Sequence, residues 1–324
     1  MNAAGPSVAA VVVTYNRKDA VTGCVARLLG QSRPPERVFV IDNASTDGTP
    51  ERLAEAGWRD HPAVEYVRLD RNTGGAGGFH DGMRRAHAAG FDWIWIMDDD
   101  AQPSPDALAL MAAHFDDPGA ACVLPMMTLA DGSPDLASTH RGILKPRDAI
   151  DDDHLGRPLT AAEIAGRDTV DISYFSFVGP CFARATIDRV GLPLAQFFIH
   201  YDDIEYSQRV VGIGRAVVVL AASIRHSEAQ MDDNVRLVRG KRRSGQEYSR
   251  LWLRYYGYRN LTWLIMHRKL DAPRWPLFVR HARKLAQVLR HDDHKWRRLR
   301  FWNAAFVDGL RGRFDNDKPR AILR

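Results

Sequence analysis

The stretch WIWIMDDD, residues 93–100, is the strongest indication of the fold of this chain. It is an apolar run that ends abruptly in three consecutive carboxylates, Asp98, Asp99 and Asp100. Apolar runs of this length are typical of buried strands, and adjacent carboxylates repel one another unless a cation neutralises them. Carboxylate oxygens are ligands for hard cations such as Mg²⁺ and Mn²⁺. The stretch therefore predicts a strand that ends in a metal site.

Side-chain alternation along a strand divides the three carboxylates into two sets. Asp98 and Asp100 are expected to face the same way, which makes them the better metal ligands, while Asp99 points elsewhere. The alternative is a solvated turn that leads into a helix capped by Ser104, with Pro105 at its first position and Asp106 in its first turn.

Strand-like and helix-like patterns alternate on both sides of this stretch. The expected strands are 8–14, 37–41, 64–69 and 93–97, and the expected helices are 18–30, 49–56 and 79–89. Further strand-like stretches occur at 174–184 and 215–224. This alternation predicts an α/β fold with a mostly parallel central sheet flanked by helices.

The second half of the chain is less regular. Residues 131–168 are rich in Pro, Gly and Asp and read as a long surface excursion, either an acceptor loop or a plain insertion. After residue 240, Arg, Trp and Tyr mix with Leu on a helical period. We expect a catalytic domain over 1–240 and a basic, mainly helical region over 241–324.

Charge is unevenly distributed between these two parts. The whole chain carries a net +5, but residues 241–324 hold 22 Lys and Arg against 7 Asp and Glu, a net +15. Three readings remain open for this excess: a solvated helical face, a surface that binds anionic membrane lipid, or a nucleic-acid site. No nucleic-acid-binding module accompanies the charge, so a nucleic-acid partner is not expected.

The N-terminus and the cysteines indicate the compartment. Residues 1–17 lack the basic start of a signal peptide and read as a buried strand, and no run is long enough to span a membrane. Cys24, Cys122 and Cys181 are far apart and read as unpaired thiols in a reducing compartment. We expect a cytoplasmic protein, peripheral at the inner face of the plasma membrane if the basic region binds lipid.

Polar residues follow each of the first four expected strands, at 14–17, 42–43, 72–78 and 98–100. Ligands of parallel sheets bind outside the carboxyl ends of the strands, so these four groups are expected to converge on one rim. Asp42 suits a base or ribose hydroxyl, but its DNAS context is also good turn chemistry. The glycines of NTGGAGG allow close approach to a ligand or form a flexible loop, and their spacing fits neither GxGxxG nor a Walker A motif.

A second acidic cluster, YDDIEY, spans residues 201–206. Its carboxylates Asp202, Asp203 and Glu205 are either part of the same site or ordinary charges at a helix N-terminus. His226 follows an apolar strand, where it is either an imidazole ligand of the same cation or a structural histidine.

Taken in order, VVVTYNR, VIDNAST, NTGGAGG, WIMDDD and FFIHYDDIEYSQR resemble the family 2 glycosyltransferases of GT-A fold. Within that family the resemblance is to galactofuranosyltransferases and the related rhamnosyltransferases. The motifs run from about residue 8 to residue 226, and YRN at 258–260 resembles a shared C-terminal element.

The resemblance implies a role for each matched residue. It implies a Mn²⁺ or Mg²⁺ site at Asp98, Asp100 and His226, a catalytic base at Asp203, and acceptor support from Asp202. It also implies that the nucleotide-sugar donor is held by Thr14, Arg17, Asp42, Asn72, Gly74, Gly75, Asp98 and Asp99.

The expected activity is inverting, metal-dependent transfer of a sugar to a hydroxyl of a glycan or lipid-linked acceptor. UDP-galactofuranose is the first choice of donor and dTDP-rhamnose the second. Two rival functions are a nucleotidyltransferase and a non-catalytic sugar-binding module. The first needs a basic glycine-rich loop after the first strand, where this chain reads TYNRKDAV, and the second is disfavoured by intact Asp98, Asp100, Asp203 and His226.

Overall fold

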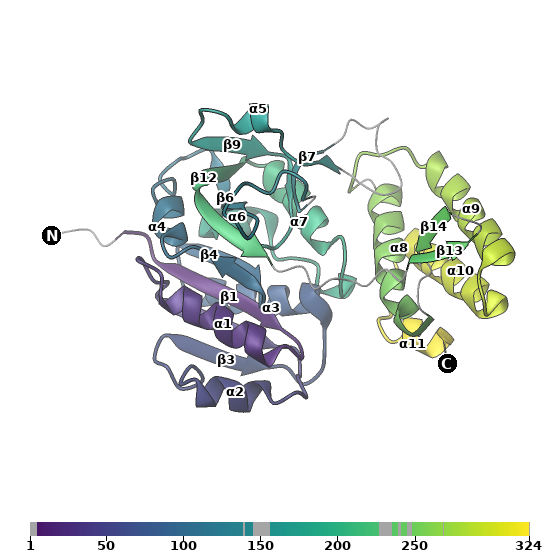
Figure 1. The fold of residues 1–324 in the computed structure, drawn as a ribbon, viewed down its shortest axis with the longest axis horizontal. Coiled ribbons are helices and arrows are strands. Elements are labelled where there is room, and N and C mark those ends of the chain that lie inside the picture. The colour runs from purple at the N-terminus through teal and green to yellow at the C-terminus, as the bar shows by residue number, and fades with distance from the viewer. Residues whose placement is uncertain are drawn as a thin grey trace. The chain divides into compact units, whose positions relative to one another are not determined.

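The computed structural model describes residues 5–138, 140–144, 156–226, 235–238, 241–244, 248–267 and 269–323. The chain folds into two compact units (Figure 1). The larger unit comprises 1–195 and 202–227, and the smaller comprises 196–201 and 228–324. The expected boundary at residue 240 falls on 239–240, outside the described residues, and stays a prediction.

A nine-stranded sheet forms the centre of the larger unit. Its strands are β1 (Val8–Thr14), β2 (Arg37–Asp42), β3 (Val64–Arg68), β4 (Trp93–Asp98), β5 (Ala101–Pro103), β6 (Ala120–Met127), β9 (Thr169–Ile172), β11 (Cys181–Ala183) and β12 (Arg215–His226). The order is β3-β2-β1-β4-β11-β6-β12-β5, with β9 paired to β12. The pairs β1–β2, β1–β4, β2–β3 and β6–β12 are parallel, which confirms the expected mostly parallel sheet.

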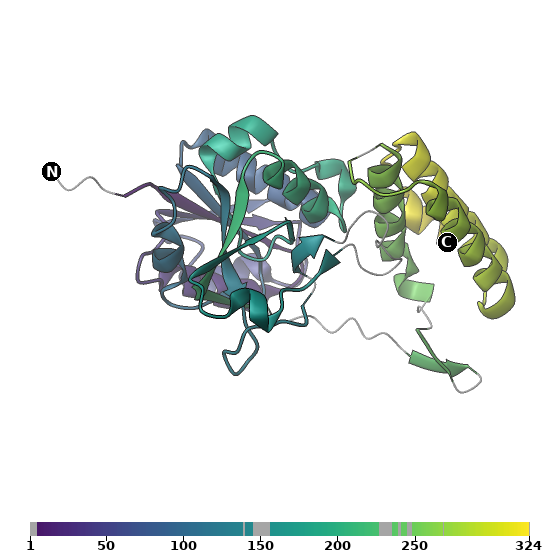
Figure 2. The ribbon, with the colours of Figure 1, turned by 90° about the horizontal axis from the view of Figure 1, so that it is seen from above.

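Helices cover both faces of this sheet (Figure 2). One face carries α1 (Lys18–Leu29), α2 (Thr49–Glu55) and α4 (Ala107–Ala112), and the other carries α3 (Gly74–Ala88), α6 (Arg184–Val190) and α7 (Asp202–Val211). Strand β1 shows why its sequence is apolar throughout. Alternate residues enter the two cores, Val8, Ala10 and Val12 on one side and Ala9, Val11 and Val13 on the other.

Two expected helix starts are wrong. Helix α3 begins at Gly74 rather than Phe79, so most of NTGGAGG is helical and not a loop. A Cβ on Gly77 would lie 2.4 Å from the hydroxyl of Thr73, and one on Gly78 would lie 2.5 Å from Val13. These two glycines therefore allow close packing within the protein.

The other wrong start is that of α4, which begins at Ala107 with Asp106 as its N-cap residue. Ser104 does not cap this helix. Its hydroxyl lies 2.9 Å from the Asp106 carboxylate, and its carbonyl accepts the N–H of Ala107 in a preceding turn.

The described part of residues 131–168 is more than a surface excursion. It contributes β7 (Arg141–Leu144) and β8 (Gly156–Arg157) to a small sheet with β10 (Tyr174–Phe175), and α5 (Ala161–Ile164) follows. The buried Arg141 guanidinium donates to the carbonyls of Pro125 and Val178. Residues 145–155 lie outside the described residues.

The smaller unit has the helical character expected from its sequence. It contains η3 (Tyr248–Arg250), α8 (Leu251–Met266), α9 (Trp275–His291), α10 (Lys295–Arg311) and α11 (Lys318–Leu323), together with an unexpected hairpin of β13 (Val235–Val238) and β14 (Lys241–Ser244). Tyr255, Val288, Phe301 and Trp302 lie in its core. Within the described residues, no helix combines the length and apolarity that a bilayer span requires.

Gly82 offers a test of the α3–β1 packing. A Cβ there would lie 2.3 Å from Val11 and 2.9 Å from Ile41, so Gly82→Ala is expected to destabilise the protein by about 1–3 kcal/mol through overpacking. Gly23→Ala in α1 is the control, because a Cβ at this position would meet no neighbouring atom within 4 Å. Alanine stabilises a helix relative to glycine by about 0.5–1 kcal/mol, so this variant should not be destabilised. Denaturant unfolding measures both variants, and equal stabilities would contradict the packing account.

Candidate functional site

The candidate site lies where the strand order of the sheet reverses. After β1 the chain moves outward through β2 and β3, and then returns to place β4 on the other side of β1. Strands β1 and β4 are parallel, with Val13 opposite Asp98, so their carboxyl ends lie at the same edge of the sheet. Such reversal points are where α/β sheets bind ligands.

Side-chain amides tie the loops after the first three strands together. Asn16, which has a positive φ of 53°, accepts the backbone N–H of Thr46 at 2.7 Å. The Asn43 side chain accepts the N–H of Thr73 at 3.1 Å and donates to the carbonyl of Gly74 at 3.2 Å. The predicted convergence of these loops on one rim is therefore present in the structure.

Thr14, the last residue of β1, and Arg17, just after it, contact the acidic run Asp98–Asp100. The hydroxyl of Thr14 donates to Asp99 at 2.7 Å. The Arg17 guanidinium bridges two carboxylates, with Nη1 at 3.1 Å from Asp99 and Nη2 at 3.0 Å from Asp100. Fixed positive charge thus offsets part of the repulsion within the acidic run.

His226, which lies more than 100 residues later in the sequence, contacts the same carboxylates. Strand β12 pairs with β5 so that His226 lies opposite Ala101, the residue after Asp100. Its Nε2 is 3.0 Å from Asp100 Oδ1 and 4.0 Å from Asp98 Oδ2. Asp98 and Asp100 therefore share His226 as a partner. Strand alternation does not account for this pairing, because β4 ends at Asp98 and residues 99–100 form a turn.

The three carboxyl groups differ in acidity. Burial raises the pKa of Asp98 to about 7 against the opposing charge of His226, although 43% of its side-chain surface stays accessible. Burial also raises the pKa of Asp99 to about 6, despite Arg17. Burial acts against ionisation of Asp100 too, but hydrogen bonds and charge from His226 and Arg17 outweigh it and lower its pKa. The run is thus only partly ionised near neutral pH.

The donor set of Asp98, Asp100 and His226 fits a divalent cation. Carboxylates suit Mn²⁺ or Mg²⁺, and an imidazole nitrogen is a common ligand of transition-metal ions. Burial of several carboxylates close together also favours a cation at this place. Within the described residues, no three His, Cys, Asp or Glu side chains already stand in metal-ligand geometry. In the protein alone, the His226 ring instead pairs directly with Asp100.

The second acidic cluster lies beside the first. Asp202 and Asp203 open α7, and Asp203 accepts the N–H of Ile204 at 2.7 Å. Burial raises the pKa of Asp203 to about 6, and burial and the neighbouring Asp203 raise that of Asp202 well above its usual range. The charge of Asp203 also raises the pKa of Asp98, so the two clusters share one electrostatic environment.

The remaining predicted donor residues serve the loops of the rim. Asp42 is fully buried and accepts the Tyr66 hydroxyl at 2.5 Å and the Ser45 N–H at 2.8 Å, which is the turn chemistry that its sequence allowed. Asn72 accepts the N–H of Gly74 at 2.7 Å at the start of α3. A Cβ on Gly75 would meet open space within 4 Å.

Sequence reasoning missed His140 in this neighbourhood. Its ring packs edge-on against that of His226, with centroids 5.1 Å apart, and its Nδ1 lies 3.2 Å from the hydroxyl of Ser176. His140 falls in the stretch read as a surface excursion, and no local pattern marks it. Tyr66, the partner of Asp42, was missed because it reads as an ordinary strand aromatic.

The family model described as glycosyl transferase family 2 matches residues 9–180 of this chain. The match spans the acidic run and the loops of the rim, and covers more than half of the sequence. The chain belongs to glycosyl transferase family 2. It is therefore a glycosyltransferase, as the sequence motifs predicted.

Curated relatives extend the likeness of this family 2 glycosyltransferase beyond the matched domain. It is 31% identical over 279 residues to galactofuranosyltransferase GlfT1 of Mycobacterium tuberculosis, an alignment that covers 84% of this chain and 87% of the relative. The protein of that name from Mycolicibacterium smegmatis is 31% identical over 280 residues, with coverage of 84% and 88%.

Solved structures confirm the predicted GT-A fold class. The mannosyltransferase PcManGT from Pyrobaculum calidifontis, in complex with GDP-Man and Mn²⁺, aligns with a TM-score of 0.56 and 17% identity over 95% of this chain and 88% of that one. Residues 1–349 of S. aureus TarS align with a TM-score of 0.54 and 16% identity over 98% and 88%. At these identities the likeness concerns the fold alone.

The raised pKa of Asp98 predicts a pH-dependent stability. A carboxyl that binds its proton more tightly in the folded protein favours folding at low pH, and this contribution is lost as pH rises from about 4, the unfolded value, to about 7. In chelator, Asp98→Asn should therefore gain melting temperature relative to wild type between pH 4.5 and pH 8.

The matched control for this prediction is Asp60→Asn, which changes an exposed carboxylate away from the site. Mn²⁺ at pH 8 should raise the melting temperature of wild type and of Asp60→Asn more than that of Asp98→Asn. A difference between Asp98→Asn and wild type that does not vary with pH would contradict the assignment.

Proposed function

We propose that this glycosyltransferase is an inverting, divalent-metal-dependent enzyme that transfers galactofuranose from UDP-galactofuranose, with rhamnose from dTDP-rhamnose as the second candidate. The observation that carries the proposal is the pairing of His226 with Asp98 and Asp100 at the end of β4, close enough to Asp203 for its charge to raise the pKa of Asp98. The galactofuranosyltransferase names of relatives that share 31% identity support the choice of sugar. Family membership favours glycosyl transfer over nucleotidyl transfer.

In this proposal Asp98, Asp100 and His226 hold Mn²⁺ or Mg²⁺. Such a cation, when bound, neutralises the diphosphate of the donor and so stabilises the departing nucleotide. Two solved neighbours, the mannosyltransferase and a GalNAc-T7, contain Mn²⁺ together with a nucleotide or nucleotide sugar, which supports a divalent cation here. Arg17 would keep Asp99 and Asp100 oriented toward the site.

Asp203 is the proposed base. With a pKa of about 6 it is largely ionised at neutral pH and can accept the proton of an acceptor hydroxyl as that oxygen attacks the anomeric carbon. A single base on the side opposite the leaving group gives one displacement and inversion. Burial and the neighbouring Asp203 raise the pKa of Asp202, which would support the acceptor beside the base.

The donor and metal assignments are tested together by nucleotide release. Wild type should release UDP from UDP-galactofuranose in Mn²⁺ or Mg²⁺ and should act more slowly on UDP-galactopyranose or dTDP-rhamnose. Asp203→Asn should lower kcat by about 10²–10⁴-fold with donor binding retained, because general-base catalysis supplies that factor. Asp100→Ala should lose both metal-dependent binding and turnover.

Asp60→Asn is again the control and should leave turnover unchanged. Turnover that persists in chelator would reject the metal assignment. Preference for dTDP-rhamnose would replace the proposed donor, and absence of turnover with all three donors would reject the proposed chemistry.

We also propose that the smaller unit binds anionic membrane lipid, which would bring the enzyme to a lipid-linked acceptor at the inner face of the plasma membrane. Helix α9 has an exposed apolar stripe, since Trp275, Phe278 and Leu289 are 74%, 42% and 52% exposed. At 100° per residue these three side chains lie on one side of the helix, together with Ala282 and Ala286.

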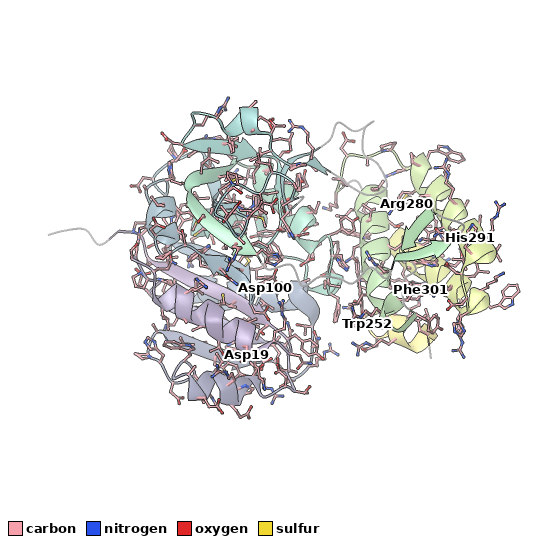
Figure 3. All side chains as sticks on the ribbon, viewed as in Figure 1. Asp19, Asp100, Trp252, Arg280, His291 and Phe301 are labelled. Atoms are coloured by element: carbon pink, nitrogen blue, oxygen red, sulfur yellow. The ribbon has the colours of Figure 1, made fainter. Side chains whose placement is uncertain are left out.

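The surroundings of this α9 stripe favour lipid over a neutral partner. Arg283 and Arg290 are exposed beside it, and α9 contains no acidic residue. Trp296, at the start of α10, is 83% exposed. Figure 3 labels Arg280 and His291 on α9. An apolar face flanked by arginines is the pattern of helices that lie in the headgroup region of anionic bilayers.

Vesicle co-sedimentation tests the α9 stripe. The protein should pellet with phosphatidylserine-containing vesicles more than with phosphatidylcholine vesicles, and less at high salt because the attraction is screened. The double variant Trp275→Ser, Phe278→Ser should bind at least ~10-fold more weakly, because burial of each side chain contributes about 1.5–3 kcal/mol.

The control for the α9 stripe is Leu129→Ser in the larger unit, where Leu129 is 49% exposed. Its vesicle binding should equal that of wild type. Equal pelleting with neutral and anionic vesicles, or an unchanged double variant, would reject the lipid surface.

A further inference from the structure

The chain enters α7 through a strained segment, residues 197–201. Phe198, His200 and Tyr201 have φ values of 66°, 68° and 65°, in the left-handed region that residues other than glycine seldom occupy. Bulky Phe and Tyr side chains are the least suited to it. Such strain persists only where surrounding groups hold the backbone, and it clusters at functional sites.

The Asn260 side chain in α8 supplies part of that hold. Its amide nitrogen donates to three carbonyls of the segment, those of Phe197 at 3.0 Å, Ile199 at 3.1 Å and His200 at 2.8 Å. Asn260 is fully buried, so these bonds form without competition from water. A single amide group thus fixes the backbone at the strained residues.

Arg259 orients this amide and adds two further bonds. Its Nε donates to the Asn260 carbonyl oxygen at 2.9 Å, which turns the amide nitrogen toward the segment. Its Nη2 donates to the carbonyls of Gln196 at 3.2 Å and Phe197 at 3.1 Å, and its Nη1 to Asn316 at 3.0 Å. Arg259 is also fully buried.

Aromatic rings complete the environment of the segment within the smaller unit. Phe198 stacks on Tyr256 with ring centroids 4.5 Å apart, and Phe197 stacks on Phe314 at 5.6 Å. Trp252, labelled in Figure 3 on α8, packs edge-on to Phe198. Hydrogen bonds therefore hold the backbone of the segment, and ring contacts hold its side chains.

We propose that Arg259 and Asn260 are positioning residues for Asp203. Tyr201 is joined by its peptide bond to Asp202, so the hold on the segment limits the backbone conformations open to the residues that begin α7. Asp203 lies in the first turn of α7, two residues after Tyr201. The inference rests on the proposed role of Asp203 as the base.

The polar character of this arrangement favours positioning over simple packing. Burial of a guanidinium and an amide costs free energy that an apolar pair of similar size would avoid. Here the two polar side chains donate hydrogen bonds to carbonyls in and next to a strained segment. Asp202, which follows that segment, begins the acidic cluster. The effect of Arg259 and Asn260 on the reaction therefore passes through the backbone.

The test uses the full-length chain with UDP-galactofuranose and Mn²⁺, and water as the acceptor. Asn260→Ala should lower kcat for UDP release by about 10–100-fold, because a small displacement of a reacting group costs up to about 10² in rate. The dissociation constant for UDP should change by less than about twofold, and the pH at which kcat rises should shift. Arg259→Lys, which keeps the charge but not the fork, should show a smaller kcat loss in the same direction.

Asn303→Ala is the matched control, since Asn303 pairs with His281 at 2.9 Å in the same unit and makes no bond to residues 197–201 among those described. It should leave kcat unchanged. Equal kcat losses in Asn260→Ala and Asn303→Ala, or loss of UDP affinity in parallel with kcat, would overturn the inference. If Asn260→Ala does not fold, Arg259→Lys is the test, and an unchanged kcat in that variant would overturn the inference. A wild type that releases no UDP would reject the proposed function itself, and this inference with it.

Discussion

The arrangement of the larger unit depends on how three adjacent carboxylates are kept together at the end of a buried strand. Asp98, Asp99 and Asp100 repel one another, and burial raises the pKa of the first two. Arg17 and His226 provide the opposing charge from two other strand ends. The sheet order satisfies this constraint, because it places β1 directly beside β4 and brings β12 back to β5.

The same constraint bears on the proposed cation site. Arg17 occupies one side of the acidic run, where it contacts Asp99 and Asp100. His226 lies on the other side, between Asp98 and Asp100, and offers a nitrogen donor. A divalent ion bound by Asp98, Asp100 and His226 would neutralise the remaining negative charge of the carboxylates. It would also lie near the proposed base, Asp203. The types of ligand atom and the excess negative charge therefore both favour a cation at this site.

The smaller unit has two separate features that bear on the proposed reaction. One is the exposed apolar stripe of α9 with its flanking arginines. The other is internal, where Arg259 and Asn260 hold a strained backbone that leads directly into α7. In the two proposals, the first feature concerns where the enzyme works and the second concerns how the proposed base is placed.

The local elements and the chemistry that they carry could be predicted from the amino-acid sequence. The apolar run of β1, the acidic residues at the end of β4 and the acidic start of α7 are local patterns. The alternation of strand-like and helix-like stretches predicted the α/β fold, and the resemblance of five motifs predicted the glycosyltransferase family. Local patterns failed where packing decides, as at α3, whose glycines fit against neighbours rather than forming a loop.

The contacts between residues far apart in the sequence become visible in the folded structure. Thr14 and Asp99 are 85 residues apart, yet their side chains lie 2.7 Å from each other. Neither His140 beside His226 nor Asn260 beneath Phe197–His200 follows any spacing rule. The physical reason is that strand order and helix docking minimise the free energy of the whole chain, so the partner of a side chain depends on residues far from it in sequence.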